Sequence, residues 1–131
     1  MLAAQANTVL RSGLPGGKPE TNSYGWLQRG FLQEKEQGLM RALFCIRLCE
    51  LAGEGTSEER MSFLMGAFIS NTYSGIRSWL ARPLVLTGNE VIGNAWRDLL
   101  IKDSIDAEVC SVETVENAFI TGLLRIHGDT A

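Results

Sequence analysis

Apolar residues recur at helical spacing through residues 1–80 of the chain. This periodicity predicts four helices, over about residues 2–11, 22–34, 38–52 and 57–80. A Gly- and Pro-rich stretch at residues 12–19 separates the first two, because glycine and proline both disfavour a continuing helix. The inward face of the second helix is expected to consist of Trp26, Leu27, Phe31 and Leu32.

The helix predicted over 38–52 is apolar over too wide an arc for a surface helix, so we expect it to be well buried. Gly53 and Gly55 follow it in the manner of a helix C-cap. Thr56 and Glu59 have the spacing of a capping box and predict the start of the next helix. Gly66 lies inside that helix at a cost of about 1 kcal/mol relative to alanine, which predicts that something packs closely against its backbone.

After residue 82 short apolar runs alternate with helical periodicity. Residues 84–87 and 106–112 are predicted strands, and residues 90–102 and 113–126 are predicted helices. Because a helix joins the two strands, they are expected to lie parallel with a right-handed crossover. We therefore predict a helix-rich α/β chain with a single domain over 1–131, mostly helical over 1–82 and strand–helix–strand–helix over 83–131.

Composition narrows the class of protein. The chain has 131 residues, of which 45% are hydrophobic and 21% charged, as in soluble globular proteins. A net charge of −3 gives no long-range attraction to phosphate backbones or anionic lipids, so neither nucleic-acid nor membrane binding is expected. The odd cysteine count and the lack of a basic segment before the first apolar stretch indicate a cytoplasmic protein without a signal peptide.

The strongest candidate site is the turn formed by Thr87, Gly88, Asn89 and Glu90. It follows the first predicted strand, and open α/β sheets bind ligands at the carboxyl ends of their strands. Gly88 would let a ligand approach the backbone, and Asn89 can cap the following helix. The turn is not a P-loop, because Asn94 stands where that motif needs lysine. An ordinary strand-to-helix turn without a ligand remains the alternative.

Other reactive side chains have plainer interpretations. Cys45 and Cys49 share a helix face, as metal ligands can, but they lie in an apolar run without a second Cys/His pair. We predict that they are core residues and that the chain has no metal site. His127, at the end of the last helix, can interact with the helix dipole. Arg47 fits either a rim position or a buried ion pair.

Several segments resemble, in collinear order, the C-terminal half of the 2-dehydro-3-deoxygalactonokinase family. The central ones are Leu43-Phe44-Cys45-Ile46-Arg47, Leu51-Ala52-Gly53 and Phe63-Leu64-Met65-Gly66-Ala67-Phe68-Ile69. Residues 24–30 precede them, and residues 84–88 and 118–123 follow, each where the family has a similar segment. The resemblance covers nearly the whole chain.

This resemblance implies a kinase with an actin-like, ribonuclease-H-like ATPase fold, here a partial domain with a short parallel strand pair flanked by helices. Such kinases transfer the γ-phosphate of ATP, with magnesium, to the sugar acid 2-dehydro-3-deoxy-galactonate in galactonate degradation. By position, Thr87, Gly88 and Asn89 would lie on the adenosine side of the cleft, with Glu90 as a weaker candidate.

The resemblance carries over no catalytic residue. No Asp-x-Gly-x-Thr phosphate hairpin occurs in the sequence, so the chain is expected to be a fragment that is incomplete for catalysis without a missing N-terminal half. The alternative is a non-catalytic helical module that binds a protein partner or forms a homodimer through the open edge of its sheet.

Overall fold

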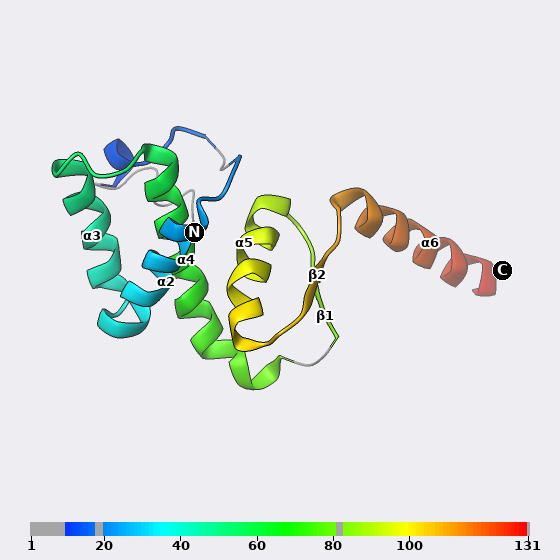
Figure 1. Cartoon of the computed structure of the whole chain (residues 1–131). Helices are drawn as coiled ribbons and strands as arrows, with labels where there is room; N and C mark the ends of the chain where they lie inside the picture. Colours follow the sequence, from blue (N-terminus) through cyan, green and yellow to red (C-terminus); the bar gives the residue numbers. More distant parts are fainter. Residues whose placement is uncertain (1–9, 18–19, 81–82, 131) are drawn as a thin grey trace. The chain divides into compact units, whose positions relative to one another are not determined.

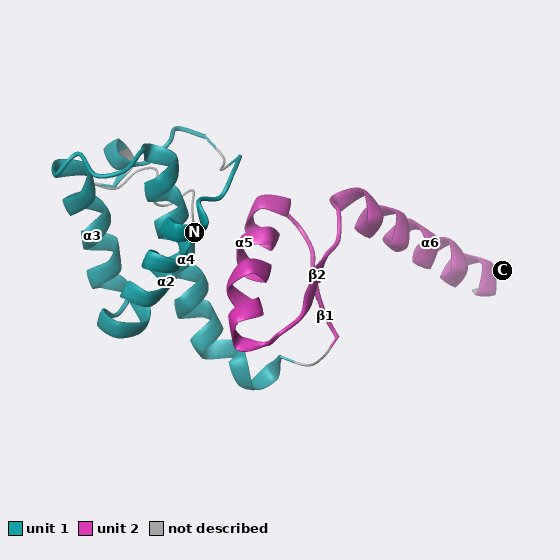
Figure 2. Ribbon diagram, viewed as in Figure 1, with its two compact units in different colours: residues 1–80 teal, residues 81–131 magenta. Residues whose placement is uncertain are grey.

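A computed structural model describes residues 10–17, 20–80 and 83–130 of the chain. The chain divides into two compact units, residues 1–80 and 81–131, which are coloured separately in Figure 2.

In the described residues of the first unit, three α-helices lie between two short 3-10 turns (Figure 1). Most of the helix predicted over 2–11 lies outside the described residues, but Leu10 is buried in the core of this unit. The predicted helix over 57–80 ends in a 3-10 turn rather than continuing as an α-helix. The elements are η1 (Arg11–Gly13), α2 (Tyr24–Gln37), α3 (Leu39–Leu51), α4 (Ser57–Ile76) and η2 (Arg77–Trp79). The core cluster consists of Leu10, Ala42, Ile46, Met61, Phe63, Leu64 and Ala67.

Helices α2 and α4 pack with their backbones in direct contact. A Cβ atom at Gly66 would overlap the carbonyl oxygen of Leu27, and one at Gly30 would overlap the carbonyl oxygen of Phe63. The close packing predicted at Gly66 is therefore confirmed. Leu27 lies at this contact and is fully buried.

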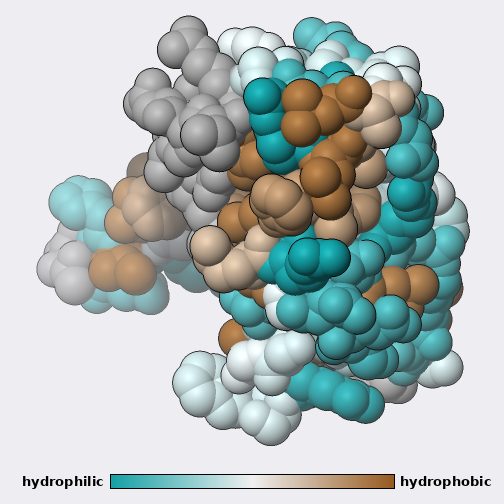
Figure 3. Space-filling view, turned by 90° about the vertical axis from the view of Figure 1, so that its left-hand side faces the viewer, coloured by the Kyte–Doolittle hydropathy of each residue, from teal (hydrophilic) through white to brown (hydrophobic). Residues whose placement is uncertain are grey.

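The prediction that the helix over 38–52 is well buried is wrong. Met40 and Leu51 are 80% and 68% exposed, and Phe44 and Leu48 lie on the same outer stripe of α3. Because α3 packs against α2 and α4 through one stripe only, no described helix of the first unit covers its remaining apolar residues. Apolar side chains gather on the side of the molecule where α3 lies (Figure 3). Leu32, predicted to face inward from α2, is likewise exposed.

The connection from α3 to α4 has the predicted caps. Gly53 adopts a φ of +67°, and the amide of Glu54 donates to the carbonyl of Cys49 at 2.8 Å, which closes the end of α3. The amide of Glu59 donates to the Thr56 hydroxyl at 3.2 Å, and the amide of Thr56 donates to the Glu59 carboxylate at 2.7 Å. Both bonds of the capping box are thus present.

The second unit pairs two short strands in parallel, as predicted. The register runs from Leu84 opposite Ala107 to Leu86 opposite Val109. Helix α5 packs against β2, and Gly93 lies against the side chain of Val109. The strands are shorter than the predicted 84–87 and 106–112. The elements are β1 (Leu84–Leu86), α5 (Glu90–Leu100), η3 (Ile101–Asp103), β2 (Ala107–Val109) and α6 (Val112–Thr130).

Candidate functional site

The turn between β1 and α5 has room for a ligand at its backbone. Gly88 adopts a φ of +110°, which residues with a side chain rarely adopt. No atom lies within 4 Å of the position that a Cβ at Gly88 would occupy. The amide of Cys110 donates to the carbonyl of Leu86 at 2.9 Å. Strand pairing therefore fixes the backbone as far as the residue before the turn.

Asn89 caps α5, as predicted. Its side-chain oxygen accepts hydrogen bonds from the amides of Val91 at 3.0 Å and Ile92 at 3.1 Å. Glu90 is the first residue of the helix and is exposed, as are Thr87, Gly88 and Asn89. The structure therefore presents the four predicted residues together on an exposed surface.

The electrostatics of this turn disfavour a phosphate. A helix N-terminus binds anions through its free amides, but the Asn89 side chain already occupies two of them. The Glu90 carboxylate adds a negative charge in the first helical turn. The Glu90 carboxylate can accept hydrogen bonds from neutral hydroxyl or amine groups. A ligand with such donors therefore suits this turn better than a phosphoryl group.

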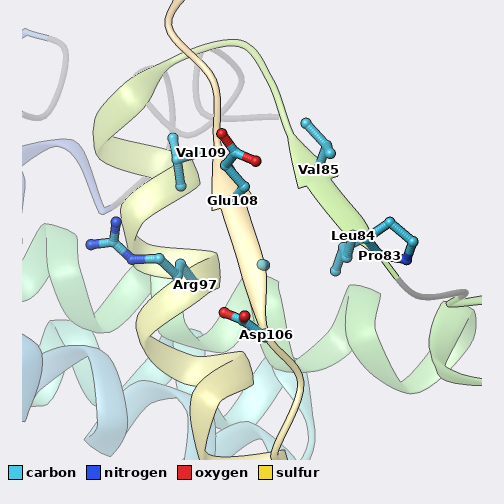
Figure 4. Close-up of a pocket in the computed structure, with 8 residues that line it drawn as sticks. Pro83, Leu84, Val85, Arg97, Asp106, Glu108 and Val109 are labelled. Atoms are coloured by element: carbon cyan, nitrogen blue, oxygen red, sulfur yellow. The ribbon is translucent and has the colours of Figure 1, made fainter.

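An open pocket of about 460 Å³ lies along the strand pair of the same unit (Figure 4). Three charged residues, Arg97 of α5 together with Asp106 and Glu108, are among the residues that line it. Sequence reasoning did not single out these residues. The local signals were Asp106 and Glu108, two charged residues within the predicted strand 106–112. The pocket is lined by Pro83, Leu84, Val85, Arg97, Asp106, Ala107, Glu108 and Val109.

A family model described as 2-keto-3-deoxy-galactonokinase matches residues 2–126, nearly the full chain. The chain belongs to this family. No curated protein and no solved structure shows a significant match. Membership indicates a sugar-acid kinase, a transferase that uses ATP and a metal ion.

The described residues form no site for the metal ion that a kinase uses. Among residues 10–17, 20–80 and 83–130, no three His, Cys, Asp or Glu side chains gather so that they could hold a metal ion. The described side chains therefore do not fit a resident metal. None of the helices in these ranges is long and apolar enough to cross a membrane.

Cys45 and Cys49 lie at the core of the first unit. Cys49 is buried, and Cys45 packs partly buried against the core cluster. Burial raises the pKa of the Cys49 thiol, and the negative charge of Glu54 raises that pKa further. The Cys49 sulfur lies 3.8 Å from a Glu54 carboxylate oxygen. A thiol held in its neutral form is a poor nucleophile, so Cys49 has a packing role.

Arg47, which the sequence left between two interpretations, is a partly exposed cation with a carboxylate partner. Its guanidinium pairs with Glu50 one turn further along α3 and donates to the Ser12 hydroxyl at 3.1 Å. The hydrogen bond from Ser12, followed by that from Arg47, lowers the pKa of the Glu50 carboxyl. This cluster ties the segment before α2 to α3, and its role is structural.

Proposed function

We propose that this chain supplies the nucleotide side of an ATP-dependent kinase with an actin-like fold that phosphorylates 2-dehydro-3-deoxy-galactonate. Membership of the 2-keto-3-deoxy-galactonokinase family supports the reaction class. The observation that carries the site is Gly88, which has an open backbone at the carboxyl end of a parallel strand. We propose that Thr87, Gly88, Asn89 and Glu90 contact the adenosine half of ATP.

The geometry supports adenosine in preference to the phosphates. Gly88 leaves space for a flat base or a ribose against the backbone, and the exposed Glu90 carboxylate can accept from ribose hydroxyls. Asn89 holds the first turn of α5 in place and so positions Glu90. When bound, ATP supplies the phosphoryl group that the reaction transfers. The triphosphate would extend away from the turn, because Glu90 repels it.

Phosphoryl transfer depends on metal ions and positive charges around the moving group. The described residues gather no metal-holding cluster, and the four turn residues include no cation. We therefore propose that the groups acting on the γ-phosphate come from a segment or partner other than the described residues. The role of this chain is then to bind and orient the nucleotide.

Calorimetric titration of the full chain with ATP, with and without magnesium, tests the proposal. We expect ATP to bind and adenosine to bind within about three-fold of it, because the phosphates gain little at this turn. Failure of ATP to bind would overturn the proposal, and adenosine binding far more weakly than ATP would overturn the adenosine assignment.

A pair of glycine variants localises the binding. Gly88→Ala should weaken ATP binding, because it adds a side chain to the open backbone and strains a positive φ. Gly38→Ala is the matched control, because Gly38 also has a positive φ of +84° and an open Cβ position but lies between α2 and α3. Equal affinities of the two variants for ATP would exclude the turn as the binding site.

A second candidate function is a non-catalytic helical module that binds a protein partner. It is favoured by the exposed apolar stripe of α3, formed by Met40, Phe44, Leu48 and Leu51, since large apolar patches mark interaction surfaces. The ATP titration distinguishes the two candidates, because the module should bind no nucleotide. If the chain also binds a protein partner, Phe44→Asp should abolish that binding.

A further inference from the structure

Helix α6 exposes apolar side chains along most of its length. Phe119, Leu124 and Ile126 are each about two-thirds exposed, at 67%, 66% and 65%. Soluble monomers rarely leave a continuous apolar surface of this kind uncovered. The exposed apolar residues of α6 are Val112, Val115, Phe119, Ile120, Leu123, Leu124 and Ile126.

Most of these residues form one straight stripe. At about 100° per residue, five of them fall within roughly 80° of arc around the helix axis. The opposite side of α6 includes Asn117 and Thr121, with Leu124 as an apolar exception. The members of the stripe are spaced three or four residues apart, which is the spacing of apolar residues in helices that pair side by side. It consists of Val112, Val115, Phe119, Leu123 and Ile126.

We propose that α6 pairs with α6 of a second copy of this chain in antiparallel orientation. A two-fold axis near residue 121 would place Phe119 against Leu123 of the second copy and Val115 against Ile126 of the second copy. The same stripe thus covers itself, as a two-fold interface requires. Helix α6 has 19 residues, so the pairing would extend over about 28 Å.

The charges on α6 favour the antiparallel arrangement. Glu113 and Glu116 lie in its N-terminal half, while Arg125 and His127 lie in its C-terminal half, with Asp129 as the one acidic exception. A parallel pair would bring these like groups together, whereas an antiparallel pair brings acidic groups beside basic ones.

Two further positions agree with the same axis. Glu116 and His127 lie on the same flank of the stripe, so an antiparallel pair places each beside the other residue of the second copy. Gly122 lies on the opposite flank, close to the axis, where a residue without a side chain lets two helices approach closely. A Cβ atom at Gly122 would meet nothing within 4 Å in the single chain.

Sedimentation equilibrium of the full chain tests the association. We expect a monomer–dimer equilibrium whose dissociation constant rises about ten-fold or more in Phe119→Asp, because a charge replaces a central apolar contact. Asn117→Asp adds the same charge on the side of α6 opposite the stripe and should leave the dissociation constant unchanged. Circular dichroism shows whether both variants keep their helices. A wild-type chain that stays monomeric, or equal constants for the two variants, would overturn the proposal.

Cross-linking tests the orientation. Val115→Cys and Ile126→Cys chains, mixed under oxidising conditions, should form a disulfide between positions 115 and 126, identified by peptide mass spectrometry. Neither variant alone should cross-link through its new cysteine, because two copies of position 115 would lie about 18 Å apart along the antiparallel pair. Cross-linking of Val115→Cys with itself would overturn the antiparallel arrangement. Because neither measurement involves nucleotide, their outcome is independent of the proposed kinase function.

Discussion

Gly66 of α4 lies so close to Leu27 of α2 that any side chain at position 66 would overlap the Leu27 carbonyl oxygen. Gly30 of α2 has the same relationship to Phe63 of α4. The two helices therefore approach through reciprocal glycine contacts, which allow the core residues between them to be fully covered. The spacing of α2 and α4 is set by these two positions.

Gly66→Ala should destabilise the first unit by about 3 kcal/mol, because the helices must separate to admit one methyl group. Gly75→Ala, in the same helix, is the matched control: nothing lies within 4 Å of its Cβ position, and alanine should stabilise the helix by up to about 1 kcal/mol. Urea unfolding followed by far-UV circular dichroism measures both. Equal midpoints for the two variants would contradict the close packing.

Arg60 holds two segments of the first unit together. Its guanidinium donates to the carbonyls of Gly13 at 2.7 Å, Glu54 at 3.1 Å and Gly55 at 2.7 Å. Arg60→Ala should lower the free energy of unfolding by about 2 kcal/mol, because it leaves these carbonyls without a charged donor. Lys35→Ala, at an exposed position of α2, should change it by less than about 0.5 kcal/mol. If the two variants unfold at the same urea concentration, Arg60 does not hold these segments.

Acid should weaken the fold through two carboxylates. Hydrogen bonds from Ser12 and then Arg47 lower the pKa of the Glu50 carboxyl below its usual 4.5. The pKa of the Glu58 carboxyl is lowered by a hydrogen bond from its own backbone amide and then by one from the Ser57 hydroxyl. Their stabilising contribution is fully present above the usual pKa and is lost as the pH falls through the lowered values.

The pH dependence can be read from urea midpoints measured between about pH 6 and about pH 3. In Glu50→Gln the midpoint should fall less steeply below the usual pKa, because this group no longer takes up a proton on unfolding. Ser12→Ala should flatten the curve in the same direction, since it removes the first cause of the shift. A Glu50→Gln curve parallel to the wild type would show that Glu50 does not contribute.

Cys49 should react with iodoacetamide more slowly than Cys45. It is buried and its pKa is raised by burial and by Glu54, whereas Cys45 is only partly buried. Alkylation rates of the two cysteines can be compared by peptide mass spectrometry. Glu54→Gln should accelerate the alkylation of Cys49, because it removes the negative charge that disfavours the thiolate. Equal rates for Cys45 and Cys49 in the native chain would contradict this environment.

Features fixed by near neighbours in the chain were predictable. The capping box of Thr56 and Glu59, the Asn89 cap and the parallel order of the strands depend on residues a few positions apart or on a single crossover. The four turn residues are contiguous, so the sequence alone could bring them together. Their contact with a nucleotide stays a prediction.

The exposure of α3 could not be predicted in this way. Its apolar arc is wider than the surface that α2 and α4 offer, and periodicity does not show how much of an arc a neighbouring helix covers. The pocket beside β1 and β2 also escaped prediction, because strand pairing brings Val85 and Glu108 together from distant parts of the sequence.

The sequence by itself determined the helices, their caps, the strand pair and the family, because these depend on local spacing and on residue types in order. Only the tertiary structure decided which apolar faces are covered, since burial depends on what lies opposite a side chain. Gly66 illustrates both contributions. Its position inside a helix predicted a close contact, and the tertiary structure shows that the contact is with the carbonyl oxygen of Leu27.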